Sequence, residues 1–284
     1  MNILTIDVEE IFHIEYSKHV KRTDLSYRTS QNIFEILDLL DRYNIISTFF
    51  VVGKVAEKCI DVMKEIYKRG HEIAFHSYDH RPLWEKTPGQ LRKEILMFNQ
   101  FLNSINVEKC IGFRAPSFSL NNETKWALGI LEKMGMWYDS SIFPVKTPLY
   151  GLSNAPIGPY KPSHKNILKE DTETHLWEFP LLVYSEIGLR IPAGGGFYLR
   201  LLPLSMIKTA IQKNMNRGYP SVLYIHNWEL DKKTPKLNLG YIKSFITYHN
   251  IKKSIIKLEY LLSKYPFTNF KNYLENAMET EKVN

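Results

Sequence analysis

The chain has 284 residues, of which 44% are hydrophobic and 13% aromatic, with 37 Lys and Arg against 30 Asp and Glu. This hydrophobic content supports one large packed domain and excludes an intrinsically disordered chain. The net charge of +7 is mild and accompanies no recognised nucleic-acid-binding motif, so no nucleic-acid partner is expected. Because no apolar run reaches roughly 18 residues and the N-terminus lacks a signal-peptide pattern, the sequence predicts a cytoplasmic protein.

Strand and helix patterns alternate along the first half of the chain. The apolar run at residues 3–7 predicts a buried strand that ends in acids. Further strands are predicted at residues 47–52, 71–76, 111–114 and 136–139, and helices at 29–43, 55–69, 88–104 and 122–134. This alternation favours parallel β/α units in a barrel or a doubly wound sheet, where sites lie at the carboxyl ends of the strands.

The second half begins with an irregular segment at about residues 144–175, whose prolines predict a long surface loop. A strand at 176–180, a helix near 203–217, a strand at 221–226 and a long helix at 240–264 then follow. We therefore expect a single catalytic domain over residues 1–265 and a frayed tail at 266–284.

The densest basic stretch lies in the last predicted helix. Lys252, Lys253 and Lys257 alternate with isoleucines there, as on the solvated face of an amphipathic helix. Such a face could instead lie near anionic lipid or a glycan diphosphate, which would make the protein peripheral to the inner membrane surface.

Two histidines four positions apart follow the predicted strand at 71–76. On one helical turn His76 and His80 would share a face, so both rings could reach one metal ion. Pairs with this spacing also arise by chance, but the position of this pair at the end of a core strand favours a metal site.

Acidic residues end the first predicted strand. In a strand Asp7 and Glu9 project to the same side, and two buried carboxylates repel each other unless a cation lies beside them. The acids therefore form either a solvated turn that caps the next helix, or a site in which one carboxylate binds a metal and the other acts as a base.

Arg114 and His226 stand at two further strand ends. Arg114, followed by a rigid Ala-Pro, is either a surface charge or a guanidinium that keeps Asp7 ionised and oriented. His226, in His-Asn-Trp-Glu, is either a buried structural histidine or a general acid. Taken together, the four signals favour one site, in which two histidines and a carboxylate leave metal positions open for water and a substrate carbonyl.

In this order the motifs resemble those of the polysaccharide deacetylases, carbohydrate esterase family four, over roughly residues 3–230. The resemblance implies an α/β fold of the distorted (β/α) barrel type. It also implies that Asp7 is the catalytic base, that His76 and His80 bind the metal, and that Arg114 with Pro116 forms the third motif.

Two further motifs complete the resemblance. Asp139, in Tyr-Asp-Ser-Ser, is similar to the fourth motif, and His226 matches the catalytic acid of the fifth. The resemblance implies that Asp139 holds the proton of His226 in place.

The first motif departs from the pattern of many members, which carry two adjacent aspartates, because Val8 follows Asp7 here. Other members have an acid two positions on, which makes Glu9 the expected ligand and Glu10 the alternative. The residues of several motifs look closest to those of a bacterial or archaeal subgroup linked to exopolysaccharide and cell-surface glycan assembly.

The implied function is metal-dependent hydrolysis, with Zn²⁺ as the expected ion, of the N-acetyl group of an amino sugar. The sugar would belong to a surface polysaccharide or to its lipid- or nucleotide-linked precursor. Pro116, Phe197, Tyr198 and Trp228 are the expected substrate-binding residues. The three aromatic side chains could offer flat faces to a sugar ring, or could simply pack in the core. Deformylation, cyclic-amide hydrolysis and glycan binding by an inactive scaffold are the alternatives.

Overall fold

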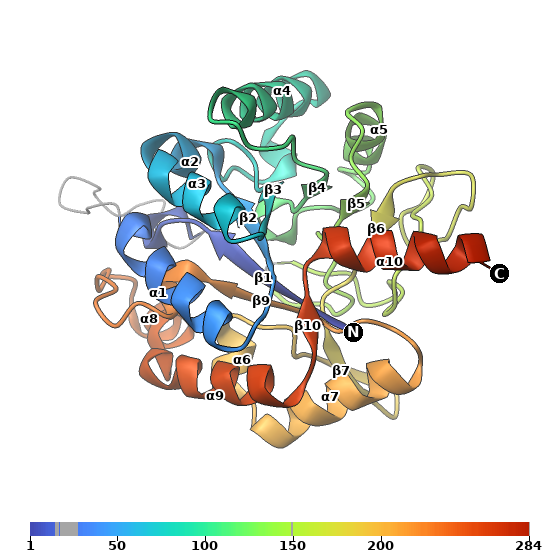
Figure 1. The fold of residues 1–284 in the computed structure, drawn as a ribbon. Helices are drawn as coiled ribbons and strands as arrows, with labels where there is room; N and C mark the ends of the chain where they lie inside the picture. Colours follow the sequence, from blue (N-terminus) through green and yellow to red (C-terminus); the bar gives the residue numbers. More distant parts are fainter. Residues whose placement is uncertain (15–16, 18–27, 149, 284) are drawn as a thin grey trace.

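The computed structural model describes residues 1–14, 17, 28–148 and 150–283 (Figure 1). Its centre is an eight-stranded sheet in which each pairing is parallel, and β1 lies between β9 on one side and β2 and β10 on the other. The sheet then continues from β2 in the order of the sequence to β6. The strands are β1 (Asn2–Val8), β2 (Thr48–Val51), β3 (Glu72–Phe75), β4 (Gly112–Phe113), β5 (Tyr138–Asp139), β6 (Trp177–Glu178), β9 (Val222–His226) and β10 (Phe267–Thr268).

Helices surround the outside of this sheet, as Figure 1 shows. A separate antiparallel hairpin is formed by β7 (Val183–Glu186) and β8 (Leu189–Pro192). The helices are α1 (Thr29–Arg42), α2 (Gly53–Lys58), α3 (Ile60–Lys68), α4 (Pro88–Ser104), α5 (Trp126–Lys133), α6 (Phe197–Leu201), α7 (Leu204–Asn216), α8 (Tyr241–Tyr248), α9 (Ile251–Lys264) and α10 (Phe270–Val283).

The sheet curls into a barrel that is closed irregularly between β6 and β9. Leu182 N–H donates to Val222 O at 3.1 Å, and Tyr224 on β9 exchanges backbone hydrogen bonds with Gly194 and Gly196. At Gly195, a Cβ atom would lie 1.6 Å from the carbonyl oxygen of Tyr224, so only glycine allows this approach. The expected fold, a distorted parallel (β/α) barrel, is confirmed.

Two predicted helices are each broken into two. The helix expected at 55–69 is interrupted at Cys59, whose ψ of 49° is not helical, and becomes α2 and α3. The helix expected at 240–264 is interrupted at Asn250, whose φ of 52° is left-handed, and becomes α8 and α9. Asparagine tolerates this conformation better than most residues, so the hydrophobic periodicity alone conceals the break.

The expected tail at 266–284 is instead part of the domain. Strand β10 pairs with the start of β1, and Phe270 is fully buried with its ring stacked 4.3 Å from that of Tyr138. Strand β10 was missed because two residues are too few to show a periodicity, and most of the remaining segment is helix α10. The irregular segment at 144–175 agrees with the expected loop, although Tyr160 and Ile167 within it are buried against the core.

Among the described residues, no helix is long and apolar enough to cross a membrane.

Candidate active site

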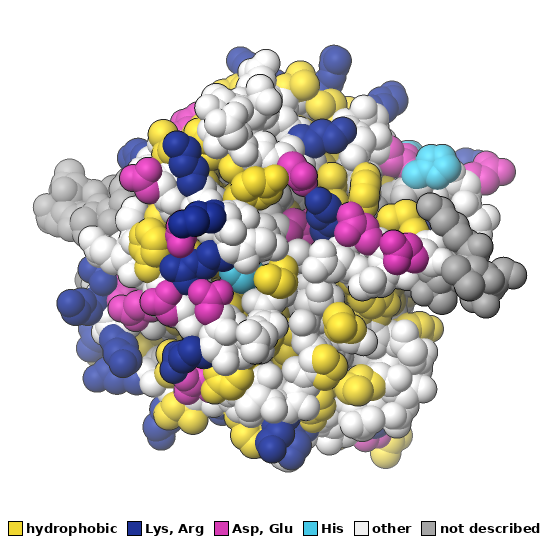
Figure 2. Space-filling model, viewed as in Figure 1, with side chains coloured by type: hydrophobic (Ala, Val, Ile, Leu, Met, Phe, Trp, Pro, Cys, Tyr) yellow, Lys and Arg dark blue, Asp and Glu magenta, His cyan; other side chains and the backbone are white. Residues whose placement is uncertain are grey.

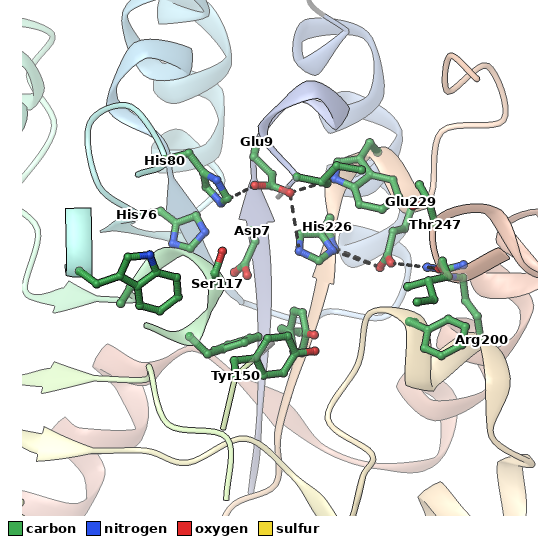
Figure 3. Close-up of a pocket in the computed structure, with 18 residues that line it drawn as sticks. Asp7, Glu9, His76, His80, Ser117, Tyr150, Arg200, His226, Glu229 and Thr247 are labelled. Carbon is green, nitrogen blue, oxygen red and sulfur yellow. Dashed lines mark hydrogen bonds and ion pairs between the residues drawn. The ribbon is translucent and has the colours of Figure 1, made fainter. Parts of the chain in front are cut away.

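Residues at the ends of β1, β3 and β9 and in the turn after β4 surround one pocket of about 230 Å³ (Figure 3). The register of the sheet brings them together, because Asp7 is the direct neighbour of His226 across β1 and β9, while Phe75 pairs with Phe113 immediately before His76 and Arg114. The lining residues are Asp7, Glu9, Ile14, His76, His80, Trp84, Ala115, Ser117, Phe118, Tyr150, Phe197, Arg200, Tyr224, His226, Trp228, Glu229, Ile246 and Thr247.

Glu9, His76 and His80 form a cluster with the donor set of a metal site. One ligand atom from each lies within 4.8 Å of the others. The Glu9 side chain is 1% exposed, and its Oε2 lies 2.6 Å from Nε2 of His80. A buried carboxylate that faces two imidazoles in this way matches the oxygen and nitrogen ligands of Zn²⁺ and related divalent ions.

His76 is held in the tautomer that metal binding requires. Its Nδ1 lies 2.8 Å from the carbonyl oxygen of Arg114, so Nδ1–H donates there and Nε2 keeps its lone pair. Burial lowers the pKa of His76 to about 4, against the opposing charges of Asp7 and Glu9. The ring is therefore neutral at pH 7 and can act as a ligand.

The two histidines do not lie on a helical turn, which corrects the sequence prediction. Residues 76–80 form a loop, in which Ser77 and His80 have φ values of 63° and 59°. These left-handed positions turn the chain so that both rings face Glu9. The conclusion that the rings converge was right, but the conformation behind it was wrong.

Glu10, the alternative ligand, points away from the cluster. Its Oε1 accepts hydrogen bonds from the backbone N–H and the hydroxyl of Thr29 at 2.9 and 2.6 Å, and both its oxygens accept from Arg28 N–H. Glu10 thus caps the start of α1, which is the role that one reading of these acids predicted.

Glu9 is instead fixed toward the pocket from both ends of the residue. Its backbone N–H donates to the Asn227 side chain at 2.9 Å, and its Oε1 accepts from the indole N–H of Trp228 at 3.1 Å.

The environments of Glu9 and Glu10 predict that the same substitution, Glu to Gln, affects metal affinity at Glu9 but not at Glu10. Glu9→Gln is expected to weaken metal affinity at least about a hundredfold, because loss of even an outer-shell partner costs 10–100-fold. Glu10→Gln should keep parental metal affinity and change only the melting temperature. Titration with Zn²⁺ by isothermal calorimetry would measure both, and a larger loss of affinity in Glu10→Gln would move the ligand to that residue.

Asp7 is paired with Arg114, which is completely buried. Nη1 of Arg114 donates to Asp7 Oδ1 at 2.6 Å and to the Thr5 hydroxyl at 2.8 Å, and its guanidinium lies over the ring of Phe50. The pair holds the carboxylate in one orientation. This contact agrees with the arrangement predicted from the sequence.

Asp139 does not lie at the pocket, and the role expected for it is not supported. It accepts a hydrogen bond from the Ser141 hydroxyl, which in turn accepts from Ala115 N–H at 2.7 Å. The carbonyl and the hydroxyl of the neighbouring Ser140 both accept hydrogen bonds from the Arg114 guanidinium. The Tyr-Asp-Ser-Ser motif therefore positions Arg114 and the turn after it, and does not reach His226.

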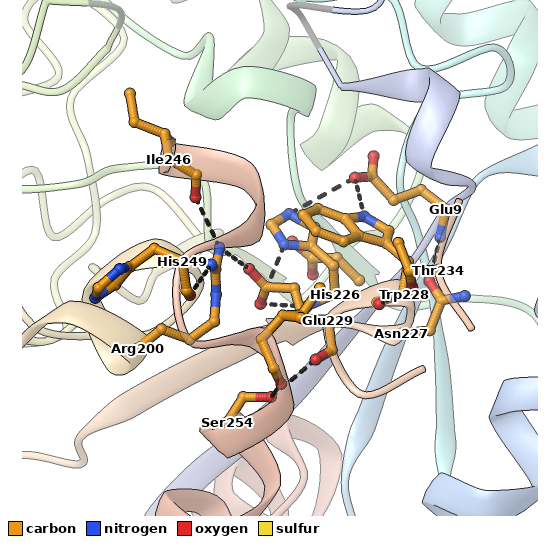
Figure 4. Close-up of polar contacts among 12 residues, drawn as sticks. Glu9, Arg200, His226, Asn227, Trp228, Glu229, Thr234, Ile246, His249 and Ser254 are labelled. Atoms are coloured by element: carbon orange, nitrogen blue, oxygen red, sulfur yellow. Dashed lines mark hydrogen bonds and ion pairs between the residues drawn. The ribbon is translucent and has the colours of Figure 1, made fainter. Parts of the chain in front are cut away.

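His226 is flanked by two other carboxylates (Figure 4). Its Nδ1 lies 3.6 Å from Glu229 Oε2, and its Nε2 lies 3.7 Å from Glu9 Oε1. Burial lowers the pKa of His226, but the hydrogen-bonding and charge of Glu229, with the charges of Glu9 and Asp7, outweigh it and raise the pKa to about 9. The imidazole is therefore protonated at pH 7, as a proton donor must be.

Arg200 holds Glu229 in this position. Its Nη2 donates to Glu229 Oε1 at 3.0 Å and to the carbonyl of Ile246, and its Nη1 donates to the carbonyl of His249. Neither residue was predicted from the sequence. Glu229 had a signal, since it lies three positions after His226, whereas Arg200 comes from a distant helix and had none.

The expected sugar-binding residues divide into two groups. Phe197 and Trp228 line the pocket, but the Trp228 ring is stacked 5.1 Å from His226 and so supports the acid. Tyr198 is half-buried and makes an edge contact with Phe143, and Pro116 is buried at the start of a short turn, so neither is among the lining residues.

Several other lining residues were not anticipated from the sequence. Ser117 and Phe118 follow Pro116 with φ values of 54° and 46°, an unfavourable conformation that turns the backbone at the pocket wall. Further aromatic side chains come from residues without any local motif, namely Trp84, Tyr150 and Tyr224.

The fold and the site define a class, a parallel α/β barrel with a candidate metal cluster and a carboxylate–histidine pair at the carboxyl ends of its strands. Comparison with known families agrees. Residues 23–138 match the family model "Polysaccharide deacetylase", and residues 140–275 match a domain of unknown function, DUF3473. Over residues 23–138, the chain is therefore similar to the polysaccharide deacetylases.

Individual relatives cover parts of the chain. A peptidoglycan-N-acetylglucosamine deacetylase of Bacillus cereus is 34% identical over 94 residues, which are 33% of this chain and 34% of the relative. A peptidoglycan deacetylase of Helicobacter pylori is 28% identical over 38% of this chain and 36% of its own length. The chain thus spans about a third of the length of these curated relatives.

A solved structure supports the fold across the whole chain. The crystal structure of a candidate polysaccharide deacetylase from Mycobacterium smegmatis superposes with a TM-score of 0.63 at 18% identity, over 98% of this chain and 90% of that one. The family model ends before His226, Glu229 and Arg200, which lie in the DUF3473 region.

Proposed function

We propose that this chain is a metal-dependent deacetylase, which hydrolyses the N-acetyl group of an amino sugar. The observation that carries the proposal is the placement of Asp7 and His226 as direct strand neighbours, beside the cluster of Glu9, His76 and His80. A base and an acid next to a metal site are what amide hydrolysis requires.

Glu9, His76 and His80 would hold the metal, for which we propose Zn²⁺. Once bound, such an ion supplies a Lewis acid that polarises the acyl carbonyl and makes a water molecule more acidic.

The residues of the chain supply the proton transfers. Asp7, held by Arg114, takes the proton of the attacking water. His226, kept protonated by Glu229, gives a proton to the nitrogen of the sugar as the C–N bond breaks. Ser117 lines the pocket, and we propose its backbone N–H as a group that helps to stabilise the oxyanion.

The substrate can be proposed more narrowly than the similarity to the polysaccharide deacetylases implies. We propose an amino sugar of a surface polysaccharide or of its lipid- or nucleotide-linked precursor, as in the exopolysaccharide subgroup that the motifs resemble. The aromatic side chains of Phe118, Tyr150 and Phe197 in the pocket wall support a sugar ring as the group bound. A cytoplasmic location remains a prediction from the sequence.

Acetate release tests the function directly. The protein is treated with a chelator, reloaded with Zn²⁺ and incubated with an N-acetylglucosamine tetramer and its N-formyl analogue. We expect acetate release that disappears with the chelator and returns with the metal. Release of formate alone would favour a deformylase, and binding of the tetramer without release would favour an inactive glycan-binding protein.

A further inference from the structure

Helix α8 carries large apolar side chains that the described part of the chain leaves largely exposed. Tyr241 is 97% exposed, Ile242 78% and Phe245 50%. All three lie within two turns of one short helix. Exposed apolar residues are common when scattered, but a cluster of this kind on one element is typical of an interaction surface.

The surroundings of α8 are strongly basic. Residues 232–258 contain seven lysines and no Asp or Glu. Six of these lysines are exposed, and Lys257 instead donates to backbone carbonyls that include that of Leu202. Figure 2 shows dark blue side chains gathered at the lower left, the side on which α8 and α9 lie in Figure 1.

The last turn of α8 belongs to the pocket. Ile246 and Thr247 line it, and Arg200 donates to the carbonyl of Ile246 at 3.0 Å. Phe245 also contacts Phe197, with the two ring centroids 6.0 Å apart. The exposed apolar residues therefore stand beside the pocket, on a helix fixed to its wall.

We propose that α8 and the lysines of residues 232–253 dock on an anionic membrane surface. Apolar and aromatic side chains inserted at the headgroup boundary, with lysines around them, are the features of a helix that lies in the membrane interface. The lysines favour anionic lipid over an apolar protein partner, because each one gains from the negative surface potential.

Docking in this way places the pocket beside the lipid headgroups. On the proposed function, the substrate would then be an N-acetylated sugar presented at a membrane, as on a lipid carrier. The docking itself rests only on α8 and its lysines, so it can be tested separately from the catalytic activity.

Sedimentation with vesicles tests the docking. The whole chain is mixed with vesicles of phosphatidylcholine alone or with phosphatidylglycerol, and we expect binding to the anionic vesicles only. Lys252→Gln with Lys253→Gln should weaken binding about 25-fold, since each lysine near an anionic surface contributes a factor of about five. Tyr241→Gln with Ile242→Gln should weaken it about tenfold or more.

A matched control is an exposed apolar pair elsewhere in the described residues, at the tip of the β7–β8 hairpin. Ile187 and Leu189 are 103% and 59% exposed, and Ile187→Gln with Leu189→Gln should leave vesicle binding unchanged. Equal loss in this control would show non-specific adsorption and overturn the proposal. Absence of parental binding to anionic vesicles would also overturn it. If, in addition, the parent were a dimer that Tyr241→Gln with Ile242→Gln converts to a monomer, the apolar surface of α8 would be a protein interface instead.

Acetate release from the soluble N-acetylglucosamine tetramer separates the two proposals. The Tyr241 and Ile242 substitutions lie outside the pocket and should leave this activity unchanged. Vesicle binding without acetate release would leave the docking standing and refute the proposed function, whereas acetate release without vesicle binding would do the reverse.

Discussion

Asp7→Asn is expected to lower kcat by about 10²–10⁴-fold while the protein keeps its bound metal, because removal of a general base typically costs this much. Asparagine preserves an oxygen for the hydrogen bond from Arg114 but cannot take a proton from water. Steady-state acetate release, together with metal content by mass spectrometry, would measure both effects.

The comparison with Glu9→Gln makes this result specific. Asp7 and Glu9 lie two residues apart at the end of the same strand, so a general effect of lost charge would affect both variants alike. We expect Asp7→Asn to lose turnover with metal retained, and Glu9→Gln to lose turnover because the metal is lost. Near-parental turnover in Asp7→Asn would mean that another group takes the proton.

Arg114 makes a stability control necessary. Its guanidinium is completely buried, and Asp7→Asn removes the negative charge that faces it. Asp7→Glu keeps that charge but moves the carboxylate, so it should fold like the parent and remain slow. If both variants bind metal and melt near the parental temperature, the loss of turnover reports the base and not the fold.

The barrel could be predicted from the sequence because its central strands are continuous apolar runs. All seven residues of β1 are buried, so the run from Ile3 to Ile6 signals a core strand directly. Short strands such as β10 and the closing segment at Gly194 could not be predicted in this way, because they are defined by backbone contacts with distant residues.

The site residues also divide into those that could be predicted from the sequence and those that could not. Asp7, His76 and Arg114 were found because each stands at the carboxyl end of a strand, and the ends of adjacent parallel strands meet in space. Asp139 was misassigned because its similarity to a motif implied a contact that the fold does not make. Arg200 was missed since its partners, Glu229 and the carbonyls of α8, are brought to it only by tertiary packing.

The acid side of the site gives the second large effect. His226→Ala is expected to lower kcat by about 10²–10⁴-fold with metal retained, and less for substrates whose leaving amine is weakly basic, because such a group needs less protonation. Rates for a series of N-acetylated amines of graded basicity would measure this dependence.

The pH profile of kcat/KM tests whether His226 is the general acid, because Glu229 raises the pKa of this histidine. A general acid must be protonated, so kcat/KM should fall as the pH rises through the pKa of His226. Without metal that pKa is about 9, and a cation on Glu9 would cancel part of the contribution of that carboxylate, which places the limb at or below pH 9. Glu229→Gln removes the charge that raises this pKa, so the alkaline limb should move to lower pH. In His226→Ala the limb assigned to His226 should disappear.

A purely structural role for Glu229 would give a different pattern. Loss of its contact with Arg200 could loosen the pocket and lower kcat at every pH, but it would leave the alkaline limb at its parental position. The shift of the limb, and not the loss of rate, therefore tests whether Glu229 controls the proton on His226. A parental alkaline limb in both Glu229→Gln and His226→Ala would show that the proton comes from another group.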